Sequence, residues 1–83
     1  MSTIYVKVKN DTSDNKSVSV FDRFGGAFRE VAGSPFALAS DELSQDFAVN
    51  ADNSGVGVID YKCVAGPSLS NIEVENDSVV DVR

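Results

Sequence analysis

The side chains that could act as nucleophiles are eleven serines and a single cysteine, Cys63. Each needs a nearby base to activate it, and the chain contains no histidine. The triads of serine and cysteine hydrolases are therefore excluded. A Ser–Lys pair is the remaining arrangement, but no Ser-x-x-Lys pair lies on a predicted helix. We expect the chain not to be an enzyme.

Acidic side chains, thirteen in all, are the other groups that could do chemistry. Glycoside hydrolysis needs two carboxyl groups about 5 to 9.5 Å apart across a cleft that holds the sugar. A chain of 83 residues has little room for such an enclosing groove. The acids are therefore expected on the solvated surface.

The segment Asn50–Gly55 places oxygen-bearing side chains at alternate positions before a glycine, as at the start of a calcium-binding EF-hand loop. The first ligand would be Asn50 instead of an aspartate, and Tyr61 stands where a bidentate glutamate is required. A hairpin turn at Asn53–Gly55 explains the same residues. One cysteine and no histidine cannot supply the usual zinc or iron–sulfur ligands, so no metal or cofactor is predicted.

Alternating apolar and polar residues indicate about seven short strands. They are expected at 4–8, 18–20, 28–32, 47–49, 56–63, 72–74 and 79–82, with 56–63 in the centre of a sheet. Turn formers at 10–16 and 53–55 predict two hairpins, and 36–44 is interpreted as a loop with one helical turn. Gly25 and Gly26 predict a further turn.

These elements predict one all-β domain over residues 1–83, an antiparallel β-sandwich or partly open barrel of about six to seven strands. A domain of this size buries only about 60% of its unfolded surface, so an edge strand could be covered by a partner or a second copy. No apolar run approaches the 18 residues of a membrane span, and no secretory signal precedes the first strand. We therefore expect a cytoplasmic protein with no membrane association, in which Cys63 is a small buried apolar side chain.

Charge is unevenly distributed along the chain, whose net charge is −6. Residues 1–33 hold five basic and four acidic side chains, whereas residues 34–83 hold two and nine. Such a field repels nucleic acid and attracts a basic protein surface. The alternative is that the charge only keeps a small domain soluble.

The segment Phe21–Glu30 holds three of the seven aromatic residues and two of the three arginines. These residue types are enriched where proteins bind one another. Phe24, beside Gly25 and Gly26, is predicted to be partly exposed and to contribute to an interface together with Arg23. The alternative is that Phe21 and Phe28 fill the core while the arginines are solvated.

Two functions follow from these observations. The first is a non-catalytic inhibitor or adaptor that masks a basic, nucleic-acid-handling surface of a protein partner, as phage-encoded anti-defence proteins do. The second is a structural accessory subunit, such as a virion decoration or tail protein, that packs through β edges. The first assigns partner binding to two groups of residues, namely Arg23 and Phe24, and the acidic Asp41, Glu42, Asp46, Asp52, Glu73, Glu75 and Asp77.

Overall fold

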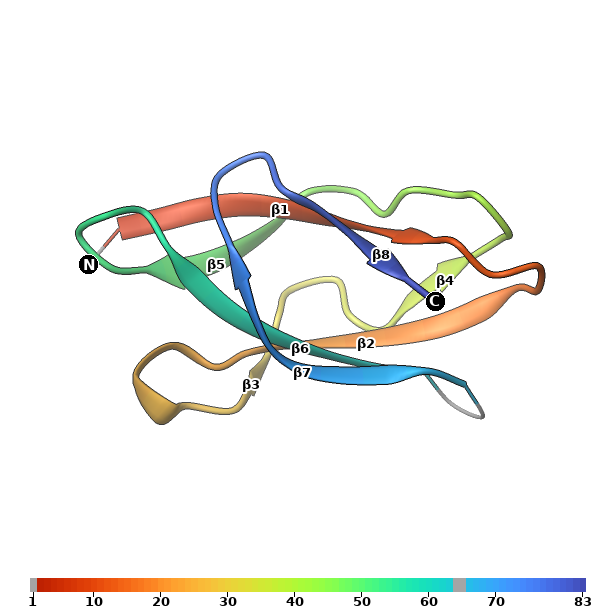
Figure 1. Cartoon of the computed structure of the whole chain (residues 1–83), viewed down its shortest axis with the longest axis horizontal. Coiled ribbons are helices and arrows are strands. Elements are labelled where there is room, and N and C mark those ends of the chain that lie inside the picture. Colours follow the sequence, from red (N-terminus) through yellow and green to blue (C-terminus); the bar gives the residue numbers. More distant parts are fainter. Residues whose placement is uncertain (1, 64–65) are drawn as a thin grey trace.

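The structure, a computed structural model, describes residues 2–63 and 66–83. It is an all-β fold in which eight strands form two facing sheets (Figure 1). The strands are β1 (Ser2–Asn10), β2 (Lys16–Asp22), β3 (Arg29–Glu30), β4 (Phe36–Leu38), β5 (Phe47–Ala51), β6 (Gly57–Cys63), β7 (Ser68–Val74) and β8 (Val79–Val82). A 3₁₀ turn, η1 (Phe24–Gly26), lies between β2 and β3.

The smaller sheet has the order β5-β1-β8, and the larger has the order β3-β2-β6-β7, with β4 also paired to β2. No pairing among the described residues closes the two sheets into a barrel, which confirms the predicted sandwich-like all-β class. All pairs are antiparallel except β1 with β8, which run parallel. The predicted central position of residues 56–63 is confirmed, because β6 lies between β2 and β7.

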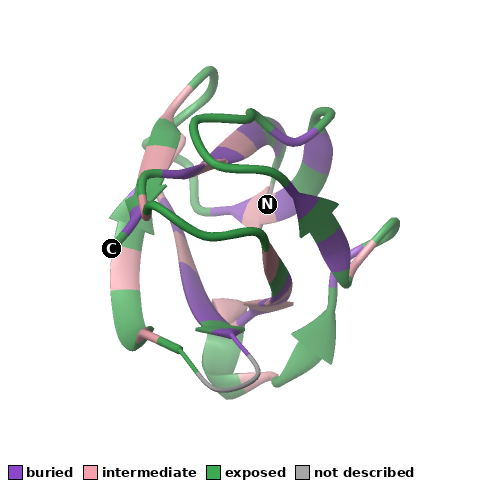
Figure 2. Cartoon of the chain, turned by 90° about the vertical axis from the view of Figure 1, so that its right-hand side faces the viewer, coloured by how far each residue is buried: buried purple, intermediate pink, exposed green. Residues whose placement is uncertain are grey.

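The core lies between the sheets, and in most strands buried residues alternate with more exposed ones (Figure 2). In β1 the buried apolar residues are Ile4, Val6 and Val8, and in β2 they are Val18 and Val20. Cys63 is also buried there, as expected from the sequence. One continuous apolar cluster therefore joins both sheets.

The predicted hairpin between the first two strands is wrong, because β1 and β2 belong to different sheets. Asn10, at the end of β1, is fully buried and directs the chain across. Its side-chain amide donates to the carbonyls of Asp14 (2.7 Å) and Leu38 (3.0 Å), and its Oδ1 accepts the Thr12 N–H (3.0 Å). The turn formers at 10–16 thus make a corner between layers rather than a two-strand ladder.

The turn predicted at 53–55 is present, but it too joins strands of different sheets. The Asp52 carboxylate accepts the N–H groups of Ser54 (2.8 Å) and Val56 (3.0 Å), which closes the turn. β5 and β6 lie very close at Gly57, where a Cβ would lie 2.8 Å from the Asn50 carbonyl oxygen. Only glycine allows this close approach of the two backbones.

Further details also differ from the sequence-based expectations. Residues 36–38, expected in a loop, form the short strand β4, with Phe36 and Leu38 buried and Ala37 exposed. Three residues are too few to show the alternation in the sequence. The third strand is shorter than predicted, because β3 covers only Arg29–Glu30.

Candidate protein-docking surface

The outer face of the larger sheet carries a compact group of aromatic and charged side chains. Phe21 comes from the end of β2, Arg23 from the residue after β2, Phe28 from the residue before β3, Val58 from β6 and Glu73 from β7. We call these five residues the aromatic face. They share one side of the sheet because Val58 lies directly opposite Glu73, and Arg23 donates its N–H to the Val58 carbonyl oxygen (2.9 Å).

Phe21 and Phe28 stack with their ring centroids 4.5 Å apart and their planes 9° from parallel. The alternative prediction in which these two rings fill the core is wrong. Val20 and Asp22 point inward, so Phe21 between them must point outward. Phe28 is 61% exposed.

Three contacts hold the Arg23 side chain in place. Its guanidinium donates to Asp60 Oδ2 (2.7 Å) and to the Ala27 carbonyl oxygen (2.9 Å), and its Cζ lies 5.0 Å from the centroid of the Phe28 ring. Asp60 is only 7% exposed, and its other carboxylate oxygen accepts the Asn71 N–H (2.8 Å). A buried carboxylate thus fixes the arginine, and the arginine and Phe21 fix Phe28.

Phe24 is half-buried, as predicted, at the start of η1. Its N–H donates to the buried Asp22 carboxylate (2.9 Å). Gly25 and Gly26 follow with φ values of 64° and 79°, which favour glycine. Of the two rings Phe24 and Phe28, Phe28 is the more exposed.

The predicted acidic residues do not gather in one place. The Asp41 N–H donates to the Asn10 carbonyl oxygen (2.7 Å), whereas the Asp52 carbonyl oxygen accepts the Ser2 hydroxyl (3.3 Å). These contacts lie at opposite ends of β1, about 26 Å apart at the usual rise of a strand. Glu42 lies beside Asp41 and accepts the Ala39 N–H (2.7 Å).

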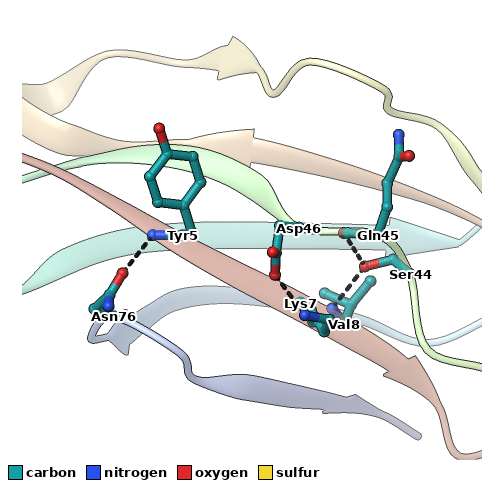
Figure 3. Close-up of polar contacts among 7 residues, drawn as sticks. All are labelled: Tyr5, Lys7, Val8, Ser44, Gln45, Asp46 and Asn76. Atoms are coloured by element: carbon teal, nitrogen blue, oxygen red, sulfur yellow. Dashed lines mark hydrogen bonds and ion pairs between the residues drawn. The ribbon is translucent and has the colours of Figure 1, made fainter.

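Asp46 is engaged with the smaller sheet, where its carboxylate lies 2.5 Å from Lys7 Nζ (Figure 3). Asn76 contacts the other side of β1, accepting the Tyr5 N–H with its Oδ1 (2.9 Å). Ser44 adds a third contact, accepting the Val8 N–H (3.0 Å). Asp46 therefore already pairs with a neighbouring lysine of the smaller sheet.

Three of the predicted acids do lie together. Glu73, Glu75 and Asp77 line a shallow groove of about 370 Å³ with Val56 at its side. None of the three forms an ion pair with another residue that the structure describes. Because Glu73 also belongs to the aromatic face, this acidic groove continues directly from the aromatic and arginine side chains.

The described residues include no group of three or more Cys, Asp or Glu side chains placed to hold a metal ion. In the loop Asn50–Gly55 the Asp52 carboxylate binds backbone N–H groups of its own turn. Burial raises the pKa of the Cys63 thiol above its ordinary value of 9.0, although the nearby Lys16 ammonium opposes this shift. A protonated thiol is a poor nucleophile at neutral pH.

Among residues 2–63 and 66–83 there is no helix with the length and apolar character needed to cross a bilayer. No protein-family model matches the chain, and no solved structure matches it. A 49-residue stretch is 41% identical to part of calcium-dependent protein kinase 9 of Oryza sativa subsp. japonica. That stretch is 59% of this chain but 8% of the kinase, so the chain spans only a small part of that protein.

Sequence reasoning singled out Arg23 and Phe24 as one group and Glu73 as a member of a separate acidic group, and it missed Phe28 as the exposed ring. The available signal was the register of the strand before it. If Val18 and Val20 face the core, then Phe21 faces outward, and any ring that pairs with it must also lie outside. Asp60 and Val58 gave no separate signal, because their place on this face depends on the pairing of β2 with β6.

Proposed function

We propose that this chain is a non-catalytic protein-binding module, an inhibitor or adaptor, that docks on a basic surface of a partner through the aromatic face and the adjoining acidic groove. The observation that carries this proposal is Phe28, a ring that is mostly exposed and yet rigidly held between Phe21 and Arg23. Large aromatic side chains that are fixed before binding contribute affinity at little entropic cost.

The unpaired acids supply the charge preference. Glu73, Glu75 and Asp77 lie along one groove, whereas Asp41 and Glu42 lie at the far end of β1 and Asp46 is paired with Lys7. A partner that covers the aromatic face would therefore meet three carboxylates at its rim. Rim charges mainly raise the association rate and make it depend on salt. Such an acidic rim suits a protein that masks a basic, nucleic-acid-handling surface of its partner.

The test is affinity capture of the tagged chain from its native cells, with elution by a salt gradient, followed by titration of the recovered protein. We expect a basic protein to bind, and Phe28→Ala to weaken binding by more than about tenfold, as hot-spot residues do. The matched control is Leu69→Ala. Leu69 is also an exposed apolar residue of the larger sheet, but it lies opposite Tyr61 on β6 and is not part of the aromatic face. Equal losses for the two variants would contradict the proposed surface.

The acidic groove is tested by its salt dependence. The double variant Glu73→Gln and Glu75→Gln should flatten the dependence of the association rate on ionic strength, with little change in the dissociation rate. Asp41→Asn is the matched control, since Asp41 is equally exposed but lies far from the groove. If Asp41→Asn had the larger effect, the partner would bind elsewhere.

A structural subunit that packs through β edges is the second candidate. It is favoured by Tyr5 and Val79, which are exposed on the outer face of the smaller sheet. An interface built on these residues would be apolar and tolerant of salt. Salt-resistant recovery of the chain itself, insensitive to Phe28→Ala, would support this function instead.

A further inference from the structure

The two sheets leave an opening between β5 and β3, and its walls are strand edges. The opening is a groove of about 230 Å³ lined on one side by Ala48 and Asn50 and on the other by Glu30 and Ala32. Both β5 and β3 are the outermost strands of their sheets. The hydrogen bonds of the neighbouring strands show which backbone groups of these two edges point into the groove.

On the β5 side, the hydrogen bonds of Tyr5 in β1 show which way the backbone groups of Ala48 point. The Tyr5 N–H donates to Asn76 Oδ1 (2.9 Å), and the Tyr5 carbonyl oxygen accepts the Asp77 N–H (2.8 Å), so both groups point away from β5. Tyr5 lies opposite Ala48, so this is a pair without mutual hydrogen bonds. The N–H and C=O of Ala48 therefore point away from β1, into the groove.

On the β3 side, the same reasoning applies to Glu30. The Val31 N–H donates to the Val20 carbonyl oxygen (3.0 Å), so the next pair along, Glu30 with Phe21, is the one without mutual hydrogen bonds. The N–H and C=O of Glu30 thus point away from β2. In the described chain no other strand pairs with Ala48 or Glu30 on these sides.

The floor and the rim of the groove define what fits. Val31 and Val49 are buried at its floor and would accept a small apolar side chain. Asp22 is already saturated by the N–H of Phe24 and by the N–H and Nδ2 of Asn50. The Arg29 guanidinium lies 3.8 Å from Asp22, and its side chain is 65% exposed, so it can pair with a carboxylate that enters the groove.

We propose that this groove binds an extended segment of a partner protein as an added β-strand between β5 and β3. The segment pairs its backbone with Ala48 and Glu30, directs small apolar side chains onto Val31 and Val49, and places an acidic side chain against Arg29. Backbone pairing with an exposed edge is a common mode of peptide recognition. This site is separate from the aromatic face and does not depend on the proposed function.

The probe is a capped hexapeptide of alternating valine and threonine with one threonine replaced by glutamate. It is titrated into the ¹⁵N-labelled full chain, and amide shifts and hydrogen exchange are followed by NMR. We expect the Ala48 and Glu30 amides to shift and to exchange more slowly. No shift at millimolar peptide, or shifts confined to other strands, would overturn the proposal.

Two substitutions separate backbone pairing from general contact. Ala48→Pro removes the N–H that faces the groove and leaves the β1–β5 hydrogen bonds in place, because proline is tolerated at such edge positions. It should weaken the peptide about tenfold, the effect of one hydrogen bond, whereas Ala48→Thr should bind like the wild type. Equal affinity for the proline and threonine variants would overturn the proposal.

The remaining controls do not depend on the folding of Ala48→Pro. The same peptide with N-methylated backbone amides should lose its affinity, and a lysine in place of its glutamate should bind more weakly than the parent. Arg29→Gln should abolish the difference between the glutamate and lysine peptides. Undiminished binding of the N-methylated peptide would show that backbone pairing is not the mode of recognition.

Discussion

Two pairs of phenylalanines occupy opposite environments in this small fold. Phe36 and Phe47 come from β4 and β5 and meet in the core, with ring centroids 5.5 Å apart and planes tilted by 33°. Phe21 and Phe28 stack more closely, at 4.5 Å and 9°, but on the outer face. The core pair joins the two sheets, whereas the outer pair joins two neighbouring segments of one sheet.

The role of an aromatic pair thus depends on which side of the sheet its residues face, and not on the residue type. Phe47 is 2% exposed and is surrounded by apolar side chains of both sheets. Phe28 is fixed by one ring and one guanidinium and is otherwise open to solvent. We therefore expect the core pair to carry stability and the outer pair to carry binding.

The largest effect should come from Phe47→Ala. Truncating a fully buried phenylalanine leaves a cavity between the sheets and should lower the free energy of unfolding by about 3–5 kcal/mol. Urea denaturation followed by far-ultraviolet circular dichroism measures this change. A loss below about 1 kcal/mol would mean that the sheets are held together elsewhere, for instance by the β1 valines.

The contrast between these pairs also shows how far the sequence could lead. Alternation in Ile4–Val8 was enough to predict the first strand and its buried side, and the long run of β-forming residues in Val56–Cys63 was enough to predict β6 and its central place. Partner strands were not predictable in this way, because a turn former such as Asn10 can begin a hairpin or a corner between sheets. Asn10 forms a corner because its buried side-chain amide donates to the carbonyl oxygens of Asp14 and Leu38. The contact with Leu38 is distant in the sequence and could not be predicted from the turn formers.

The candidate site was predictable to the same extent. The segment Phe21–Glu30 could be singled out from its composition, but the exposure of Phe28 depends on the outward direction of Phe21. The grouping of Glu73 with Arg23 depends on β6 lying between β2 and β7. Local patterns thus predict which side chains point the same way along one strand, and only the sheet order shows which strands bring them together.

An intermediate effect is expected from Asp60→Ala, which removes the anchor of the outer pair. The substitution leaves the Asn71 N–H and the Arg23 guanidinium without their buried acceptor, at a cost of about 2–3 kcal/mol in unfolding free energy. The matched control is Asp46→Ala, which removes the exposed ion pair with Lys7 and should cost less than about 1 kcal/mol. Comparable losses for the two variants would show that burial of Asp60 adds nothing.

Of Phe47→Ala, Asp60→Ala and Phe28→Ala, the last should have the smallest effect on stability. The ring loses one stacked partner and one cation–π contact, but little apolar surface returns to water, so the unfolding free energy should fall by about 1 kcal/mol. The same substitution should weaken partner binding more than tenfold, so its effect on affinity should exceed its effect on folding. Parallel urea denaturation and binding titrations of one preparation measure both.

A loss of stability as large as that of Phe47→Ala would place Phe28 in the structural core and remove the distinction between the two pairs. A small loss of stability with unchanged affinity would instead leave the stack as a support for the η1 loop, and the search for the contact surface would move to Phe24.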